Sequence, residues 1–323
     1  MTRNRILLIL VALLIAGGGV FLAVREPARV LPPEFNQSIE TPAQSLTKIR
    51  FGPEGKTVLA GGATGTVVSV TLENRLVQRM APATDDPLTC LAESPDGLIL
   101  AGSVSGRLRA WTRLDFEKTP AASPKLAVTC AAFGAERSEK RMALGLADGR
   151  FVLKTRDEQL VRETDHRGVK CLLMTADGKT LISSGSEGLI LWHDAESGTT
   201  LGELQEHRSE VAALVASPEF DRLASGDWNG ELRVIDVETR KVVAKAQQPE
   251  AVSGLAWRGD LLITSSWDGY LRIWRINDTT LELSHEINTG RPIYDMNVNS
   301  DASLAATVCG DAAIEFWKLP VAP

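Results

Sequence analysis

The stretch "SSWDGYLRIW", residues 265–274, decides how this chain folds. Its Asp-Gly dipeptide is typical of the tight turn between two antiparallel strands. The stretch also holds two tryptophans, Trp267 just before the turn and Trp274 at the end of the following strand. One of them is expected to be buried, so the position of the other needs a separate explanation.

The same hairpin recurs along the chain at a nearly constant interval. Six copies share the turn glycine, which is Gly65, Gly106, Gly149, Gly188, Gly230 and Gly269. A seventh copy, "CGDAAIEFW", has Ala312 at that place, and successive copies lie 39 to 43 residues apart. A period of this size indicates a repeat architecture rather than one irregular core. Seven units account for almost the whole chain.

Each unit has the same internal order of short apolar and polar segments. An apolar strand such as "VKCLLMT" comes first, then a strand of small residues such as "LASG", then the hairpin, an apolar third strand and a polar fourth one. Four antiparallel strands per period, with turn residues between them and little helical periodicity, are typical of a propeller blade. The sequence therefore predicts an all-β fold, a seven-bladed β-propeller of four-stranded antiparallel blades.

These units resemble the WD-repeat β-propeller family, in its bacterial, membrane-anchored type, over roughly residues 36 to 319. Blade five carries the resemblance best, with His207, Ser225 and the closing Asp236, and blade six keeps Asp268 and Trp274. The resemblance implies an internal hydrogen-bond tetrad of His, Ser or Thr, Asp and Trp in each blade.

Several residues depart from that pattern. Val70, Lys154 and Ile235 stand where the family prefers tryptophan, so the tetrad is incomplete in every blade. The resemblance still implies that Asp148 and Asp268, each just before its turn glycine, bond groups within their own blades. The tryptophans that end third strands should pack between neighbouring sheets; they are Trp111, Trp192, Trp274 and Trp317.

The last blade lacks a strand, because the seventh repeat stops at "IEFWKLP" after its third strand. The segment "EFNQSIETPAQSLTKIRF" aligns with the stretch that links blades six and seven. We therefore expect residues Phe35 to Glu40 to supply the missing outer strand and to remove an exposed sheet edge.

The N-terminal segment predicts a membrane anchor. Ile6 to Val24 is an uncharged run of 19 residues, and a helix of that length spans ~28 Å, close to the ~30 Å hydrocarbon core of a bilayer. The alternative is a cleaved signal peptide, with Ala16 and Gly18 as small residues at the cleavage site. The predicted organisation is a transmembrane helix or signal anchor at 1–25, a Pro-containing linker at 26–35 and the propeller at 36–323.

A very short basic N-terminal tail normally stays inside, although Arg25 and Arg29 nearly balance Arg3 and Arg5. We therefore expect a single-pass protein of the inner (cytoplasmic) membrane with an extracytoplasmic propeller, which in a Gram-negative bacterium is periplasmic. Without Arg3, Arg5 and Arg25, 32 basic residues face 41 acidic ones, a net charge of −9. An acidic domain of this kind is not expected to bind nucleic acid.

The residues that could carry catalysis are few. Among the four cysteines, Cys90, Cys130 and Cys171 occupy one position in successive inner strands and predict small buried residues rather than disulfides or a metal site. The four histidines are His166, His193, His207 and His285, and their places in the repeats predict that they do not converge. The sequence therefore predicts no enzyme, no cofactor, no metal and no small-molecule substrate.

A protein-interaction scaffold held at the membrane is the predicted function, and the alternative is an extracytoplasmic propeller enzyme or cofactor-binding protein. Trp267 and Trp228 occupy the same place in blades six and five, on the face that carries the loops between blades. We expect both indoles to meet one rim with His207, Arg208 and Tyr294, because aromatic and arginine residues dominate binding hot spots. The alternative is that both rings only cover the core.

Overall fold

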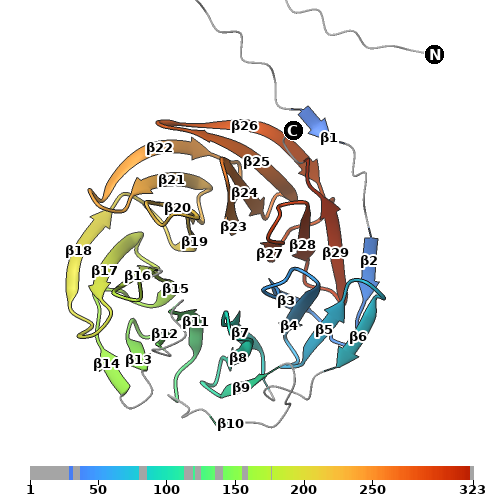
Figure 1. Cartoon of the computed structure of the whole chain (residues 1–323), viewed down its shortest axis with the longest axis horizontal. Coiled ribbons are helices and arrows are strands. Elements are labelled where there is room, and N and C mark those ends of the chain that lie inside the picture. The colour runs from blue at the N-terminus through green and yellow to red at the C-terminus, as the bar shows by residue number, and fades with distance from the viewer. Residues whose placement is uncertain are drawn as a thin grey trace, which may run out of the picture.

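The computed structural model describes residues 29–31, 37–79, 86–112, 119–120, 125–134, 141–154, 159–175 and 177–320. These residues form seven sheets arranged as blades in a ring (Figure 1). In each blade the first strand of the repeat lies next to the centre of the ring and the last strand lies at the outer rim. The predicted all-β, seven-bladed propeller of four-stranded antiparallel blades is confirmed.

The strands of the first four blades have these bounds. Blade one contains β3 (Leu46–Phe51), β4 (Thr57–Gly62), β5 (Val67–Thr71) and β6 (Leu76–Arg79). Blade two contains β7 (Leu88–Glu93), β8 (Leu98–Ser103), β9 (Leu108–Thr112) and β10 (Thr119–Pro120). Blade three contains β11 (Val128–Phe133), β12 (Met142–Leu146), β13 (Phe151–Lys154) and β14 (Gln159–Arg162). Blade four contains β15 (Val169–Met174), β16 (Thr180–Gly185), β17 (Leu189–Asp194) and β18 (Thr200–Gln205).

The last three blades include the two N-terminal strands. Blade five contains β19 (Val211–Ala216), β20 (Arg222–Asp227), β21 (Glu231–Asp236) and β22 (Lys241–Gln247). Blade six contains β23 (Val252–Arg258), β24 (Leu261–Ser266), β25 (Tyr270–Asn277) and β26 (Thr280–Asn288), with β1 (Arg29–Leu31) at its edge. Blade seven contains β27 (Asp295–Val298), β28 (Leu304–Val308), β29 (Ala313–Lys318) and β2 (Gln37–Glu40).

The small residues of the second strands permit close packing between blades. A Cβ atom placed on Gly226 in β20 would lie 2.5 Å from Val252 Cγ1, at the start of the next blade. The same relation joins Gly102 to Val128, at 2.8 Å from its Cβ. The first apolar residue of one inner strand thus packs directly on the glycine of the preceding blade, a contact that a larger side chain would prevent.

The tryptophans that end the third strands are buried between sheets, as predicted. Trp111, Trp192, Trp274 and Trp317 are at most 7 % exposed. The Trp274 indole donates a hydrogen bond to Thr264 Oγ1 at 3.1 Å, and Trp317 donates to Thr307 Oγ1 at 2.9 Å. All four rings therefore fill core volume, and those of Trp274 and Trp317 also satisfy their N–H groups within their own blades, whereas the buried Trp192 N–H has no acceptor among the described residues.

The ring is closed by the N-terminal segment. β2 pairs antiparallel with β29, with Ile39 opposite Ile314. Beyond it, the Thr41 hydroxyl donates to the Ala312 carbonyl at 2.8 Å. The closure predicted for this part of the chain is confirmed for residues 37–40.

A further strand lies within the segment predicted to be a spacer. β1 pairs parallel with β26, with Arg29 opposite His285, and gives blade six a fifth strand. The chain therefore joins the outer edge of blade six before it completes blade seven (Figure 1). The predicted membrane segment Ile6–Val24 lies outside the described residues, and the part of the chain that is described contains no helix long and apolar enough to cross a bilayer.

Candidate functional site

Two tryptophans project from equivalent hairpin turns in neighbouring blades. Trp228 lies in the β20–β21 turn and Trp267 in the β24–β25 turn. Each turn closes two residues later on a glycine with positive φ, Gly230 at 80° and Gly269 at 81°, a conformation that side chains disfavour. The same backbone geometry thus places both indoles at the same height on adjacent blades.

Tyr294 extends this pair to a third blade. It immediately precedes β27, and its ring rests on Gly310, where a Cβ atom would lie 3.0 Å from Tyr294 Cε2. The ring centroids of Trp228 and Trp267 are 5.4 Å apart, and those of Trp267 and Tyr294 are 6.1 Å apart. The three side chains are 49 %, 44 % and 47 % exposed. We call Trp228, Trp267 and Tyr294 the aromatic rim.

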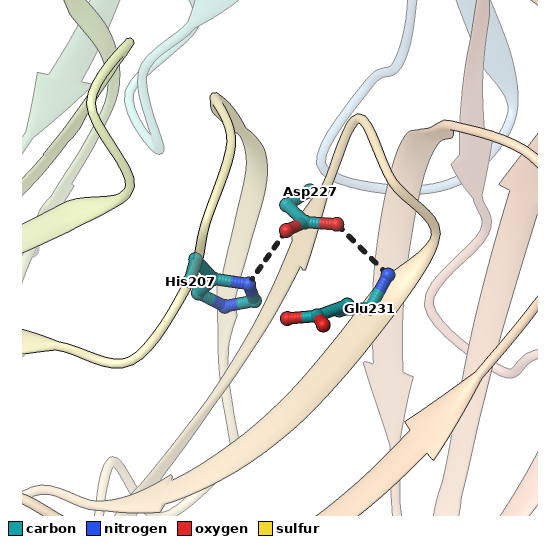
Figure 2. Close-up of side chains that lie close together, drawn as sticks. All are labelled: His207, Asp227 and Glu231. Carbon is teal, nitrogen blue, oxygen red and sulfur yellow. Dashed lines mark hydrogen bonds and ion pairs between the residues drawn. The ribbon is translucent and has the colours of Figure 1, made fainter.

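The fourth predicted member of this surface, His207, lies elsewhere. Its side chain is buried, and its Nε2 lies 2.7 Å from Ser225 Oγ. On the other side of the ring, Nδ1 lies 3.2 Å from Asp227 Oδ2 (Figure 2). His207 therefore cannot offer an exposed contact surface, and its expected place beside the tryptophans is corrected. The next residue, Arg208, is exposed.

Arg208 stays beside the rim because its loop contacts the Trp228 turn. The Trp228 backbone N–H donates to the Glu210 carbonyl at 3.0 Å, and the Asn229 N–H donates to Ser209 Oγ at 3.2 Å. The structure thus brings three of the five predicted residues into contact, places the loop of Arg208 next to the Trp228 turn and buries the histidine within the blade.

The buried His207 network has a different role, which is to shape the Trp228 turn. Asp227 Oδ1 accepts hydrogen bonds from the backbone N–H groups of Asn229 at 3.0 Å and Glu231 at 2.8 Å. Burial opposes ionisation of Asp227, but hydrogen bonds from His207 and the Glu231 backbone outweigh it and lower its pKa. An ionised Asp227 therefore fixes the turn that carries Trp228.

His207, Asp227 and Glu231 also form a group whose ligand atoms all lie within 4.8 Å of one another, as a metal site would require (Figure 2). His207 Nδ1 and Asp227 Oδ2 lie 3.2 Å apart, and neither atom makes a hydrogen bond of standard geometry. Glu231 accepts a hydrogen bond from Arg233 at 2.6 Å. A guanidinium at that distance opposes a divalent cation, so we interpret this group as structural.

Two other histidines converge, against the prediction that they would not. His166 Nε2 and His193 Nε2 each lie 2.8 Å from Ser183 Oγ in blade four, and His166 Nδ1 contacts Glu187. His166, Ser183 and His193 are all buried, so a substrate has no access to this network. The second-strand motif "LISSG", which holds Ser183, was the sequence signal that could have revealed it.

The central channel has a cavity of about 320 Å³ lined by the inner strands, among them Cys90, Cys130 and Cys171. All four cysteines are free thiols. Burial raises the pKa of Cys90 to about 11, and burial together with Glu315 raises that of Cys309 to about 12. The thiols are thus protonated at neutral pH and are poor nucleophiles.

Comparison with known proteins identifies the class. The family description "WD domain, G-beta repeat" matches residues 198–236 and 242–275, from the outer strand of one blade to the third strand of the next. One chain of the solved "Crystal Structure of Mitotic Checkpoint Complex" aligns with a TM-score of 0.80 at 17 % identity, covering 94 % of this chain and 100 % of that one. The chain therefore has the β-propeller fold, and its residues 198–236 and 242–275 match the WD40 repeat model.

Curated relatives share the repeats at low identity. Actin-interacting protein 1 of Drosophila melanogaster is 25 % identical over 166 residues, which are 50 % of this chain and 27 % of that protein. The SIR4-interacting protein SIF2 of Saccharomyces cerevisiae is 24 % identical over 254 residues, which are 73 % of this chain and 47 % of that protein. The chain spans less than half the length of these relatives.

Proposed function

We propose that this chain is a membrane-tethered scaffold of the bacterial type, whose propeller holds a partner protein on the aromatic rim. One observation carries the proposal: three roughly half-exposed aromatic side chains from blades five, six and seven lie in contact in one row. Large aromatic rings that stay in water without a protein partner are typical of interaction surfaces, and tryptophan, tyrosine and arginine dominate their binding energy.

The class of the fold supports a protein partner. WD40 propellers mediate protein–protein interactions, and two relatives are named for the proteins they bind, actin and SIR4. The histidines of the two networks are buried, and burial keeps the Cys90 thiol protonated, so none of these groups is arranged as an accessible acid, base or nucleophile. We therefore assign binding, rather than chemistry, to this propeller.

The proposed tether is compatible with an open binding face. The N-terminal segment attaches through β1 and β2 to the outer edges of blades six and seven, and not to the hairpin turns that carry the rim. An anchor at Ile6–Val24 would hold the disc by its edge at the cytoplasmic membrane, with the propeller on the extracytoplasmic side. A phosphatase fused to the C-terminus tests this orientation, since it is active only outside the cytoplasm.

Crosslinking in the native membrane, followed by mass spectrometry, tests the partner proposal. We expect the full chain to give a defined crosslinked partner that the double variant Trp228→Ala, Trp267→Ala loses, while its melting temperature stays within a few degrees. Val104→Ala is the matched control, because Val104 is 54 % exposed at the same turn position in blade two. Unchanged partner recovery per folded molecule in the double variant would reject the rim as the binding surface.

A further inference from the structure

The aromatic rim has geometric properties that limit what its partner presents. Successive rings are tilted by 48° and 40°, so they form a row of open wedges rather than one flat platform. Stacked bases need faces parallel to their own planes, and the acidic charge of the chain disfavours a phosphate backbone. The rim is therefore better suited to a peptide than to a nucleic acid.

The polar atoms of the rim indicate which kind of peptide would bind there. The indole N–H groups of Trp228 and Trp267 have no hydrogen-bond acceptor among the described residues, and the Tyr294 hydroxyl has none either. The rings themselves pack closely. The row of half-exposed rings therefore carries three donors that have no acceptor among the described residues. A ligand that matches this row needs apolar side chains and backbone carbonyls that have no partners of their own.

Three common modes of peptide recognition differ in whether the backbone carbonyls of the peptide are free to accept hydrogen bonds. A helix has already bonded its carbonyls internally, except at its last turn. An added β-strand needs a free strand edge, whereas the rim consists of hairpin turns and the residue before an inner strand. A polyproline II segment leaves all its carbonyls unbonded, so it can accept hydrogen bonds from the donors of the rim.

The arginines near the two ends of the aromatic rim differ in charge pairing, and this difference would orient a charged ligand along the rim. Arg208 is exposed next to the Trp228 turn and has no carboxylate within salt-bridge distance among the described residues. At the other end, Arg291 is already paired with Asp311 and Glu315. The row thus has an available positive charge beside Trp228 and a neutralised one beside Tyr294.

We propose that the aromatic rim binds a proline-rich segment of its partner in the polyproline II conformation, with an acidic residue of that segment paired to Arg208. Proline rings of that segment enter the wedges between the aromatic rings, and the indole and phenol groups donate to its backbone carbonyls. This inference rests on the proposed function, because it names the chemistry that the interaction surface recognises.

The test is calorimetric titration of the purified full chain with the peptide EEPPPPPPP. Controls are EEPGPGPGP, which cannot hold the same conformation, and KKPPPPPPP, which reverses the charge. We expect the first peptide to bind and the glycine-interrupted one to bind at least about tenfold more weakly, since preorganisation is lost. The double variant Trp228→Ala, Trp267→Ala should weaken binding by about 30-fold, as loss of a hot spot does, and Val104→Ala should have no effect.

Two finer variants test the assignment of individual groups. Trp267→Phe keeps an aromatic ring but removes the N–H donor. Its affinity for EEPPPPPPP should lie between those of wild type and Trp267→Ala. Arg208→Glu should reverse the preference, so that KKPPPPPPP binds better than EEPPPPPPP. The proposal is overturned if wild type does not distinguish EEPPPPPPP from EEPGPGPGP, or if the rim variants bind it equally well.

Failure of this inference is distinguishable from failure of the proposed function. A crosslinked partner that depends on Trp228 and Trp267, without polyproline binding at the rim, overturns the polyproline assignment and leaves the rim as the binding surface. Polyproline binding that the rim variants abolish supports the assignment. If the crosslinked partner is recovered equally well with the same variants, the proposal that the rim holds this partner is contradicted, and the polyproline assignment stands.

Discussion

Asp268 Oδ2 lies 2.7 Å from Arg272 Nη2 inside the blade-six hairpin, and both side chains are largely buried, at 14 % and 5 % exposure. Asp268 Oδ1 also accepts the Tyr270 N–H at 3.1 Å, and Arg272 reaches on to Glu286 at 2.7 Å. The aspartate before the turn glycine thus bonds within its own blade, as the family resemblance implied.

Asp268→Ala should lower the free energy of unfolding by about 1 to 3 kcal/mol, because it leaves a buried guanidinium with one partner fewer. Asp148 serves as the matched control, since it occupies the same turn position but its pair with Arg150 is 34 % and 37 % exposed. Asp148→Ala should cost less than about 1 kcal/mol. Urea unfolding of both variants checks this, and equal losses would contradict it.

The two tryptophans of the same hairpin should respond differently to truncation. Trp274 is 5 % exposed and packs between blades five and six, so Trp274→Ala should cost about 3 to 5 kcal/mol. Trp267 is 44 % exposed, and Trp267→Ala should cost only about 1 to 2 kcal/mol, because it loses its two aromatic contacts with Trp228 and Tyr294 but little buried volume. Thermal unfolding measures both, and a stable Trp274→Ala variant would show that the interface between these blades is not where stability resides.

Closure of the ring should depend on β2 rather than on the residues before it. A chain that begins after residue 41 loses β2 and leaves the edge of β29 unpaired, so we expect a lower melting temperature and aggregation through that edge. A chain that begins at residue 35 lacks β1 but keeps β2 and is the control. Equal melting temperature and solubility of the two truncated chains would exclude closure by β2 as a source of stability.

Acid should destabilise blade four through His193. Burial, with a smaller contribution from His166, lowers the pKa of His193 from 6.5 to about 4. The unfolded chain therefore binds this proton first, so the contribution of His193 to stability is complete above about pH 6.5 and is lost as pH falls toward 4. The full effect is at most about 3 kcal/mol.

His193→Gln removes the titrating group while it keeps a polar side chain beside Ser183. The stability difference between wild type and this variant, measured by urea unfolding from pH 7 to pH 4, should shrink or change sign as the pH falls. A difference that stays constant over this range would contradict the role of His193.

Most of the fold was predictable because each blade follows from a local sequence pattern that recurs along the chain. The turn glycine, the small residues of the second strand and the apolar third strand define each blade within about forty residues of sequence. The incomplete last repeat also predicted where the ring closes, since β29 needs an outer partner. β1 was not predicted, because it has only three residues, lies in a Pro-containing segment and shows no strand pattern of its own.

The candidate site was predictable only in part. Repeat alignment placed Trp228 and Trp267 at equivalent turns, and this determined that they share one face. It could not determine that Arg208 is exposed while His207, one residue earlier, is buried against Ser225 and Asp227.

The sequence by itself therefore determined the blades, their number and the strand that closes them, because strands and turns follow from short-range alternation and from glycine. Only the tertiary structure decided which side chains meet across blades, such as Trp267 with Tyr294 in the rim. It also decided that His166 and His193, from opposite ends of one blade unit, share Ser183. Such contacts depend on the angle and distance at which whole sheets pack, and these are set by the closed ring rather than by any single repeat.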